Sequence, residues 1–444
     1  MLHTTPQAAL AATAIAIAPI ALAQPAEPPQ DPPREWFGVP NAVPYPEWGQ
    51  ATGDWAGLRI DLESVGLTVE IANLLEFSQV LSGGVEQNES FRNLFTAGVA
   101  LDTDTALDLP GGTAFIQYLS VSPESGGSTD AGDLQVFSNL ENDRSVDAIY
   151  ELWYEQRLLD DRLRFKVGKL DANSEFAAVG PPASFTRGSA NDFAAAGEPL
   201  NSSAGFSPTV VGFPSYPDSA MGFNVFVTPL RTDTLSLTLG YGLYDGAAAI
   251  DGIRTGTRGP STFFSADLSN DYFHVAEAQL GWARLAALSG GSLSLGGWHH
   301  TGTFDTFDGN QDDGTSGLYA TVQQRLTAPR GDTSDQGLYA IAQLGFADGD
   351  VAEVERHYAL GLVQAGLGSF RPDDATGFYA SYAELSDEPA AGFDSDEITL
   401  EAFYRAQLTA AAFLQPDLQW VLNPSGDSDT DDAVVLSIRF GVNF

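Results

Sequence analysis

Basic side chains are scarce in this sequence, and a quarter of them fall in one short stretch. The chain has 20 Lys and Arg residues against 59 Asp and Glu residues, which gives a formal net charge of −39. Five basic residues, including both lysines of the chain, lie within thirteen positions: Arg157, Arg162, Arg164, Lys166 and Lys169. This cluster offers charged hydrogen-bond donors to a polar ligand.

Residues with catalytic or metal-binding potential form no constellation. The absence of cysteine excludes disulfides, Cys-ligated zinc, iron–sulfur clusters and thiol catalysis. Neither G-x-S-x-G nor H-E-x-x-H occurs. His299 and His300 are adjacent, so on a strand they point to opposite faces and do not form a simple shared metal site. We therefore expect no enzyme activity, cofactor or metal; a β-rich hydrolase is the disfavoured alternative.

The acidic charge bears on two further classes of partner, nucleic acid and calcium ions. A pI near 4.1 argues against nucleic acid, because phosphate contacts need clustered Lys and Arg. The stretch Asp308–Asp313 begins like a calcium-binding EF-hand loop. It lacks glycine at the sixth position, and Tyr319 stands where a bidentate Glu is needed. Calcium in this loop is therefore the weaker interpretation, and solubility in a salty habitat accounts better for most of the acidic residues.

The segments that carry these residues alternate with period two. Leu163, Phe165 and Val167 share one face, and Arg164 and Lys166 share the other. About sixteen such strands fit between residues 67 and 444, and no apolar run reaches 18 residues. We predict an all-β fold, a transmembrane antiparallel β-barrel of about sixteen strands. A large soluble β-sandwich or β-helix is the alternative.

Connections between the expected strands differ in length. Short ones fall at 159–162, 230–234 and 289–292, and long ones at 123–145, 173–218, 245–270, 301–315 and 424–432. Short turns at one end and long loops at the other are typical of a membrane barrel. The longest connection, 173–218, is rich in phenylalanine and poor in charge, so we expect it to fold into the lumen and narrow it. An ordered external flap is the alternative.

The N-terminal part divides into two segments ahead of the barrel. Residues 1–23 contain no charged side chain apart from His3 and end in Ala-Leu-Ala, which predicts a secretory signal peptide rather than a membrane anchor. Residues 24–66 are a Pro-rich segment followed by a short amphipathic helix over 55–64 that would rest on the barrel rim, with Asp54 as its cap and Gly66 at its end. Residues 67–444 form the barrel domain, and its terminal Phe444 fits an outer-membrane insertion signal.

Strand parity assigns side chains to the lumen. In the strand over 146–158, for example, Tyr150, Leu152 and Tyr154 are expected to face lipid. The residues expected to line the pore are Glu70, Glu76, Arg92, Glu151, Trp153, Glu155, Arg157, Arg164, Lys166, Glu401, Arg405 and Arg439.

Several blocks of the sequence resemble one known family. These blocks are 49–59 (GQATGDWAGLR), 163–176 (LRFKVGKLDANSEF), 403–409 (FYRAQLT), and 414–424 with the closing residues up to Arg439 and Phe444. In combination and in this order they are similar to the carbohydrate-selective porins, the OprB-like family. The resemblance implies a sixteen-stranded barrel with a periplasmic N-terminal helix and a sugar-selective pore.

Together these observations predict an outer-membrane porin of a Gram-negative bacterium that passes neutral carbohydrates by passive, substrate-selective diffusion. The basic wall and Trp153 would form a sugar track, facing Glu70 and Glu76 across a transverse field; ordinary lumenal ion pairs are the equal alternative. Expected partners are neutral sugars, outer-membrane lipid and lipopolysaccharide, and the barrel-assembly machinery through the Phe444 strand. A homotrimer is left open. A general cation-preferring porin and a secreted β-rich carbohydrate-binding protein are the alternative functions.

Overall fold

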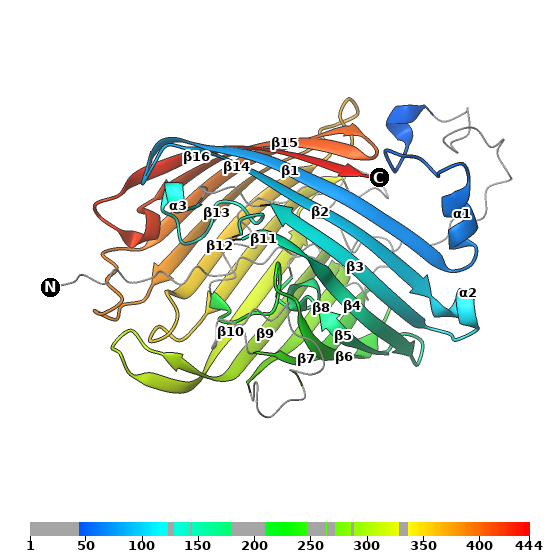
Figure 1. Cartoon of the computed structure of the whole chain (residues 1–444), viewed down its shortest axis with the longest axis horizontal. Helices are drawn as coiled ribbons and strands as arrows, with labels where there is room; N and C mark the ends of the chain where they lie inside the picture. The colour runs from blue at the N-terminus through cyan, green and yellow to red at the C-terminus, as the bar shows by residue number, and fades with distance from the viewer. Residues whose placement is uncertain are drawn as a thin grey trace.

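The chain folds into one closed β-barrel (Figure 1). The structure is a computed structural model that describes residues 44–122, 128–142, 144–178, 209–246, 263, 271–285, 288–327 and 336–444. Sixteen strands build the wall: β1 Leu67–Gly84, β2 Glu89–Asp102, β3 Gly112–Ser122, β4 Val146–Leu158, β5 Leu163–Leu170, β6 Ala220–Arg231, β7 Leu235–Asp245, β8 Tyr272–Leu285, β9 Leu288–Asp305, β10 Gln311–Arg325, β11 Gly337–Phe346, β12 Val354–Ala365, β13 Ala375–Leu385, β14 Glu397–Thr409, β15 Ala412–Leu422 and β16 Asp431–Asn443.

Every strand pairs antiparallel with its neighbour in sequence, and β1 pairs with β16 to close the ring. At this closing seam Phe77 lies opposite Ile438 and Glu76 opposite Arg439. Closure removes free sheet edges, so all sixteen strands have a hydrogen-bonding partner on each side. The predicted sixteen-stranded barrel is confirmed, and the β-sandwich and β-helix are excluded.

Alternation along the strands explains the barrel. In β12, Tyr358, Leu360 and Leu362 point outward and are exposed, while His357 and Val363, on the opposite face of the strand, are fully buried inside. Large exposed apolar side chains recur on the outer wall of the other strands. An apolar outer belt of this extent is stable in hydrocarbon and unstable in water.

The two ends of the barrel differ. One end carries the N-terminal segment 44–66, the helix α2 Thr103–Leu107 and the turns at 159–162, 232–234, 366–374 and 410–411. The opposite end carries α3 and the strand ends that bound the two longest connections, at Leu170, Ala220, Asp245 and Tyr272 (Figure 1). Two expected connections were wrong in extent. Residues 301–305 and 311–315 belong to β9 and β10, so their hairpin loop is only 306–310, and 289–292 lies inside β9.

The helix ahead of the barrel is shorter than expected. Helix α1 spans Leu58–Glu63, because Gly57 before it is left-handed and Trp55 and Ala56 have positive φ. Of its apolar residues, Leu58 and Ile60 are exposed and Leu62 is half-buried, while the buried residue is Arg59. No helix in the described residues is long and apolar enough to cross a membrane.

Strand β4 departs from simple parity. Opposite Gln117 and Tyr118 of β3, β4 carries a bulge, because Glu151 and Ile149 are the partners and Tyr150 is skipped. The bulge turns Tyr150 into the barrel, where it is 2% exposed, and Ile149 outward. The expectation that Tyr150 faces lipid was therefore wrong, while Leu152 is outward and exposed.

Candidate functional site

The lumen is narrowed first by residues 128–142, which fold back along the inner wall. The segment begins with helix α3 Ser128–Ala131. Most side chains of the segment are buried. Backbone N–H groups of Leu134 and Gln135 donate to the two carboxylate oxygens of Glu397, each at 2.8 Å. At the other end of the segment, Ser138 donates its hydroxyl to Glu76 at 2.5 Å. The segment is thus fixed across β14–β16, β1 and β2.

The longest connection narrows the lumen from the wall between β5 and β10. Its first part, 171–178, includes η2 Ala172–Ser174 and runs along the wall to β8 and β10. Ala177 donates its N–H to Glu277 at 2.8 Å, and Thr321 donates its hydroxyl to the carbonyl of Ala178 at 3.1 Å. Phe176 is fully buried and stacks on Phe226, with ring centroids 5.2 Å apart. This first part of the connection lies inside the barrel, as expected. Residues 179–208 lie outside the described part of the chain.

The two inserted segments cover different arcs of the ring, since Glu175 of the second pairs with Arg164 and Lys166 on β5 before the segment reaches β8 and β10. Residues 128–142 contact strands around the β1–β16 seam, while 171–178 reach β8 and β10, about half the ring away in the strand order. The lumen between them is therefore much narrower than the bare sixteen-stranded wall would leave.

The first charged cluster joins β4, β5 and the inserted segment. Arg164 donates to Glu155 at 2.9 Å and to both oxygens of Glu175, at 2.9 and 2.7 Å. The Lys166 ammonium lies 2.5 Å from Glu175 and 4.0 Å from Glu155. Arg157 also donates to Glu155 at 2.8 Å, and Glu151 interacts electrostatically with Lys166, so three cations and three carboxyl groups form one balanced network. Burial raises the pKa of Glu175, but Arg164 and Lys166 outweigh it, so the pKa of this carboxyl is lowered overall.

Aromatic rings lie directly against these cations. The Lys166 ammonium sits 4.1 Å from the centre of the Trp153 ring, and the Arg164 guanidinium sits 4.1 Å from the centre of Phe226. Trp153 also contacts Phe115, with ring centroids 5.1 Å apart. The cluster therefore combines fixed hydrogen-bonding groups with flat apolar surfaces.

The second charged cluster lies at the closing seam. Glu76 accepts from Arg439 at 2.8 Å and from Arg92 at 3.3 Å. Arg92 also donates to Glu141, at 2.7 Å from Nε, and Arg439 donates to Asn139 at 2.7 Å. Two cations meet two carboxylates here, and the network ties the 128–142 segment to β1, β2 and β16.

This geometry corrects one expectation. We expected the basic wall to face Glu70 and Glu76 across the pore and to set a transverse field. Instead Glu76 pairs with Arg92 and Arg439, and the basic wall pairs with Glu155 and Glu175, so each charge is balanced by its neighbours. Charges balanced at close range leave little long-range field.

The remaining predicted pore residues lie outside these two networks or at their margins. Glu70 is half-buried on β1 and interacts electrostatically with Glu151. Arg157 is half-exposed and donates to Glu155 at 2.8 Å. Glu401 is buried on β14, and the guanidinium of Arg405 lies 3.8 Å from the centre of the Phe413 ring. The structure thus does not gather the twelve predicted residues into one track.

Asp171 follows β5 directly and is fully buried inside the barrel. It accepts a hydrogen bond from the Tyr150 hydroxyl at 2.6 Å and one from the backbone N–H of Asn173 at 2.9 Å. Burial and the neighbouring Glu151 raise the pKa of Asp171 to about 7. Its carboxyl therefore changes charge in the physiological range.

Comparison with known proteins decides the family. The sequence model of the carbohydrate-selective porin, OprB family, matches residues 89–444. The chain belongs to this family. Porin B of Pseudomonas aeruginosa is 22% identical over 448 residues, covering 88% of this chain and 90% of that protein. An Acinetobacter baylyi protein with "porin QuiX" in its name is 22% identical and covers 88% of this chain and 92% of its own length.

A solved structure of Pseudomonas putida OprB at high pH has the same fold. It superposes with a TM-score of 0.75 at 19% identity, over 90% of this chain and 99% of that one. The family resemblance seen in the sequence is therefore confirmed. The block at 49–59 lies ahead of the family match, and the blocks from 163 onward lie inside it.

The parity argument missed four lumenal residues. Glu175, Glu141, Ser138 and Asn139 come from connections, where alternation assigns no face. A signal for Glu175 was present, because it lies within the family-like block 163–176 that also holds Arg164 and Lys166. Glu141 carried no such signal.

The acidic loop at 308–313 has a local structural role. The carboxylate of Asp308 accepts from Thr306 at 2.5 Å and from the Asn310 amide at 2.6 Å, which closes the β9–β10 hairpin. Within the described ranges, no group of three His, Asp or Glu side chains is arranged to hold a metal ion.

Proposed function

We propose that this chain is an outer-membrane porin that passes neutral carbohydrates by passive, substrate-selective diffusion. Membership of the carbohydrate-selective porin family supports a channel for carbohydrates rather than an enzyme. The observation that carries the neutral-sugar part is the balanced network of Arg164, Lys166, Glu155 and Glu175 beside the Trp153 ring.

Such a network suits a neutral polar solute. Sugar hydroxyls both donate and accept hydrogen bonds, so they can exchange with carboxylates and with basic groups in turn. Aromatic planes match the C–H faces of the pyranose ring. Because the local charges cancel, the network provides many hydrogen bonds without a strong preference for either ion sign. Each contact must remain weak, since tight binding would reduce flux.

The proposal includes the cellular setting. The apolar outer wall fits lipid, so we place the barrel in the outer membrane of a Gram-negative bacterium, in contact with phospholipid and lipopolysaccharide. Residues 1–23 would be its signal peptide, and residues 24–66 a periplasmic segment; the first 43 residues lie outside the described part of the chain. Delivery through the assembly machinery by the Phe444 strand, and a homotrimer, are further expectations.

The test is ion current through the purified protein in a planar bilayer, titrated with neutral sugars. We expect a concentration-dependent, saturable block by one sugar class. Lys166→Gln and Trp153→Ala should weaken that block, whereas Arg356→Gln, at an ion pair with Glu384 far from the cluster, should leave it unchanged. An open channel whose current is not blocked by sugar in the parent protein would contradict sugar selectivity.

A second candidate is a general cation-preferring porin. The net charge of −39 favours it, because acidic loops at the pore mouth would concentrate cations. Reversal potentials under a salt gradient distinguish the two. Strong cation preference without sugar block would establish the second candidate, while weak ion preference with sugar block would establish the first.

A further inference from the structure

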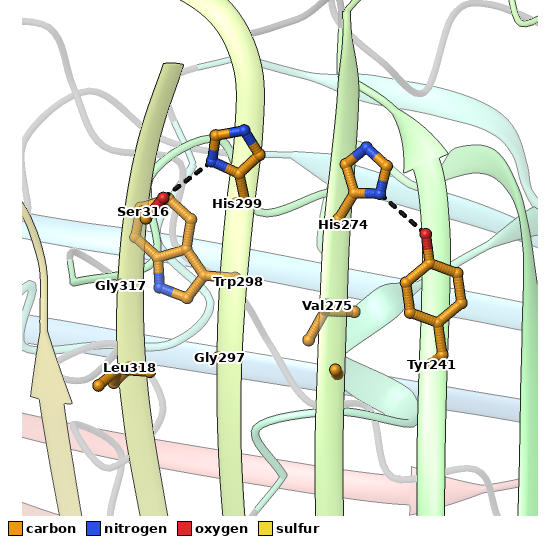
Figure 2. Close-up of a pocket in the computed structure, with 10 residues that line it drawn as sticks. Tyr241, His274, Val275, Gly297, Trp298, His299, Ser316, Gly317 and Leu318 are labelled. Atoms are coloured by element: carbon orange, nitrogen blue, oxygen red, sulfur yellow. Dashed lines mark hydrogen bonds between the residues drawn. The ribbon is translucent and has the colours of Figure 1, made fainter.

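Four polar side chains form a row on the outer wall of the barrel. Tyr241, His274, His299 and Ser316 lie on the successive strands β7, β8, β9 and β10 (Figure 2). They point outward, since Val275 and Trp298, which flank the histidines in sequence, are buried inside. Polar groups on a lipid-facing wall are costly unless they serve a purpose or lie near the interface.

This row lies where the exposed side chains of the outer wall change from apolar to polar. Toward the barrel centre, the exposed side chains next to it are apolar: Leu295 and Leu318. Toward the end with the long connections, the exposed residues are Thr301, Thr303 and Asp313. The histidines therefore sit at the boundary between the apolar belt and the polar rim, within reach of aqueous ions.

The two histidines face each other across the sheet. His274 and His299 are direct partners in the β8–β9 ladder, which places their Cβ atoms about 4.5–5.5 Å apart. Their ring centroids are 6.3 Å apart. The partner of His299 is thus His274 on the next strand, and not its sequence neighbour His300, which is buried inside against Gly246.

Each imidazole is held through the same ring nitrogen. The Nδ1 atom of His274 is hydrogen-bonded to the Tyr241 hydroxyl at 2.8 Å, and that of His299 to the Ser316 hydroxyl at 2.8 Å. Figure 2 shows the second nitrogen of each ring on the side away from its hydroxyl. A hydrogen bond that fixes one imidazole nitrogen orients the other for a metal ion, and metal-binding histidines commonly have such support.

The spacing suits a shared ion. A nitrogen–zinc bond of about 2.0–2.1 Å puts each ring centre roughly 3 Å from the metal. Two rings on one ion therefore have centres roughly 5–6 Å apart, so small side-chain rotations suffice from the observed 6.3 Å. An open depression of about 470 Å³ on the outer wall lies beside them, with Gly297 and Ala276 in its lining, and it has room for water ligands.

We propose that His274 and His299 form a binding site for a divalent first-row transition-metal ion, such as Zn²⁺ or Cu²⁺, on the outer wall. The two Nε2 atoms are the protein ligands, and water completes the coordination. Imidazole nitrogen is a preferred ligand for these ions, and Mg²⁺ and Ca²⁺ prefer oxygen. The ion would cross-link β8 to β9 at the polar rim, and the site is independent of the proposed sugar pathway.

The test uses untagged, chelator-treated protein in detergent. Electron paramagnetic resonance of added Cu²⁺ should show two imidazole nitrogens in the parent protein and one in His274→Ala or His299→Ala. Titration calorimetry with Zn²⁺ should give one ion per barrel in the parent, and no binding in the double variant. The same affinity in the double variant, or no Zn²⁺ binding in the parent at millimolar ion, would overturn the proposal.

Two further variants separate the site from general surface binding. Ser316→Ala and Tyr241→Phe keep both ligands but remove their hydroxyl supports, so Zn²⁺ affinity should fall roughly 10–100-fold. Thr303→Ala, at an exposed position on β9, should change nothing. Heat-dependent migration on gels checks that every variant forms the closed barrel. Equal affinity across all three variants would contradict the assigned geometry.

Discussion

Arg59 of the N-terminal segment donates a hydrogen bond from Nη2 to the backbone carbonyl oxygen of Phe444, beside the closing seam. Its Nη1 donates to the carbonyl of Val69 at 2.9 Å, and the Trp55 ring covers the guanidinium at 3.8 Å. Ala51 adds a backbone hydrogen bond to Asn443 at 2.7 Å. Residues 44–66 are therefore fastened to both strands that close the barrel.

Replacement of Arg59 tests this fastening. Arg59→Ala removes charged hydrogen bonds to two carbonyls, and hydrogen bonds to charged groups contribute about 1.5–3 kcal/mol. We expect denaturant unfolding to shift toward lower stability by about that amount, with open-channel conductance unchanged. Arg157→Ala, at a half-exposed side chain, is the matched control and should cost less. Equal losses in both variants would contradict a special role for Arg59.

Neutralising Glu175 should change ion selectivity. Glu175→Gln removes a carboxylate that pairs with both Arg164 and Lys166, so the lumen gains a net positive charge there. The reversal potential under a salt gradient should move toward anions, and breaking this buried network should cost about 3–5 kcal/mol. Asp308→Asn, in an exposed hairpin, is the control. An unmoved reversal potential would place the network away from the ion path.

Glu397 tests the 128–142 segment. Its carboxylate accepts N–H groups from Leu134, Gln135 and Ser425, so Glu397→Ala releases the segment from β14. We expect a larger single-channel conductance with more frequent current fluctuations. Asp394→Ala, which removes a nearby exposed carboxylate bonded to Ser428, should leave conductance unchanged. A conductance equal to that of the parent would mean that the segment does not limit the pore.

Asp171 predicts a pH dependence of stability. Its pKa rises from 3.8 to about 7 on folding, so between these values the folded chain keeps a proton that the unfolded chain has lost. This contribution is fully present below pH 3.8 and is lost as the pH rises through 7. The denaturant midpoint of unfolding should therefore decrease as the pH is raised from 4 to 7. In Asp171→Asn the midpoint should depend less steeply on pH. An identical slope in the variant would assign the effect to other groups.

The sequence predicted the barrel because alternation is a property of each strand by itself. Parity failed where a backbone irregularity shifts the count, as at Tyr150, since a bulge has no reliable sequence signal. The N-terminal helix was placed too early because Trp55 and Ala56 suit a helix by type but adopt positive φ.

The candidate site was predicted less completely than the fold. Arg164, Lys166 and Glu155 were found because they alternate on strands, but their shared partner Glu175 lies on a connection. Likewise, Arg92 and Arg439 were identified while Glu141 and Asn139 were not. The connection 123–145 was recognised as long, but the insertion of its 128–142 part was not, because anchors such as Glu397 are far away in sequence.

The order of strands around the ring has a kinetic consequence. Fifteen of the sixteen ladders join strands that are adjacent in sequence, and only the β1–β16 ladder joins residues such as Phe77 and Ile438. Strands that are neighbours in sequence can pair early, whereas closure of the ring requires the last strand. Arg59 reaches Phe444 and Val69 together only after closure. Resistance of the Arg59 peptide bond to trypsin would therefore report, during assembly, the moment at which the ring has closed.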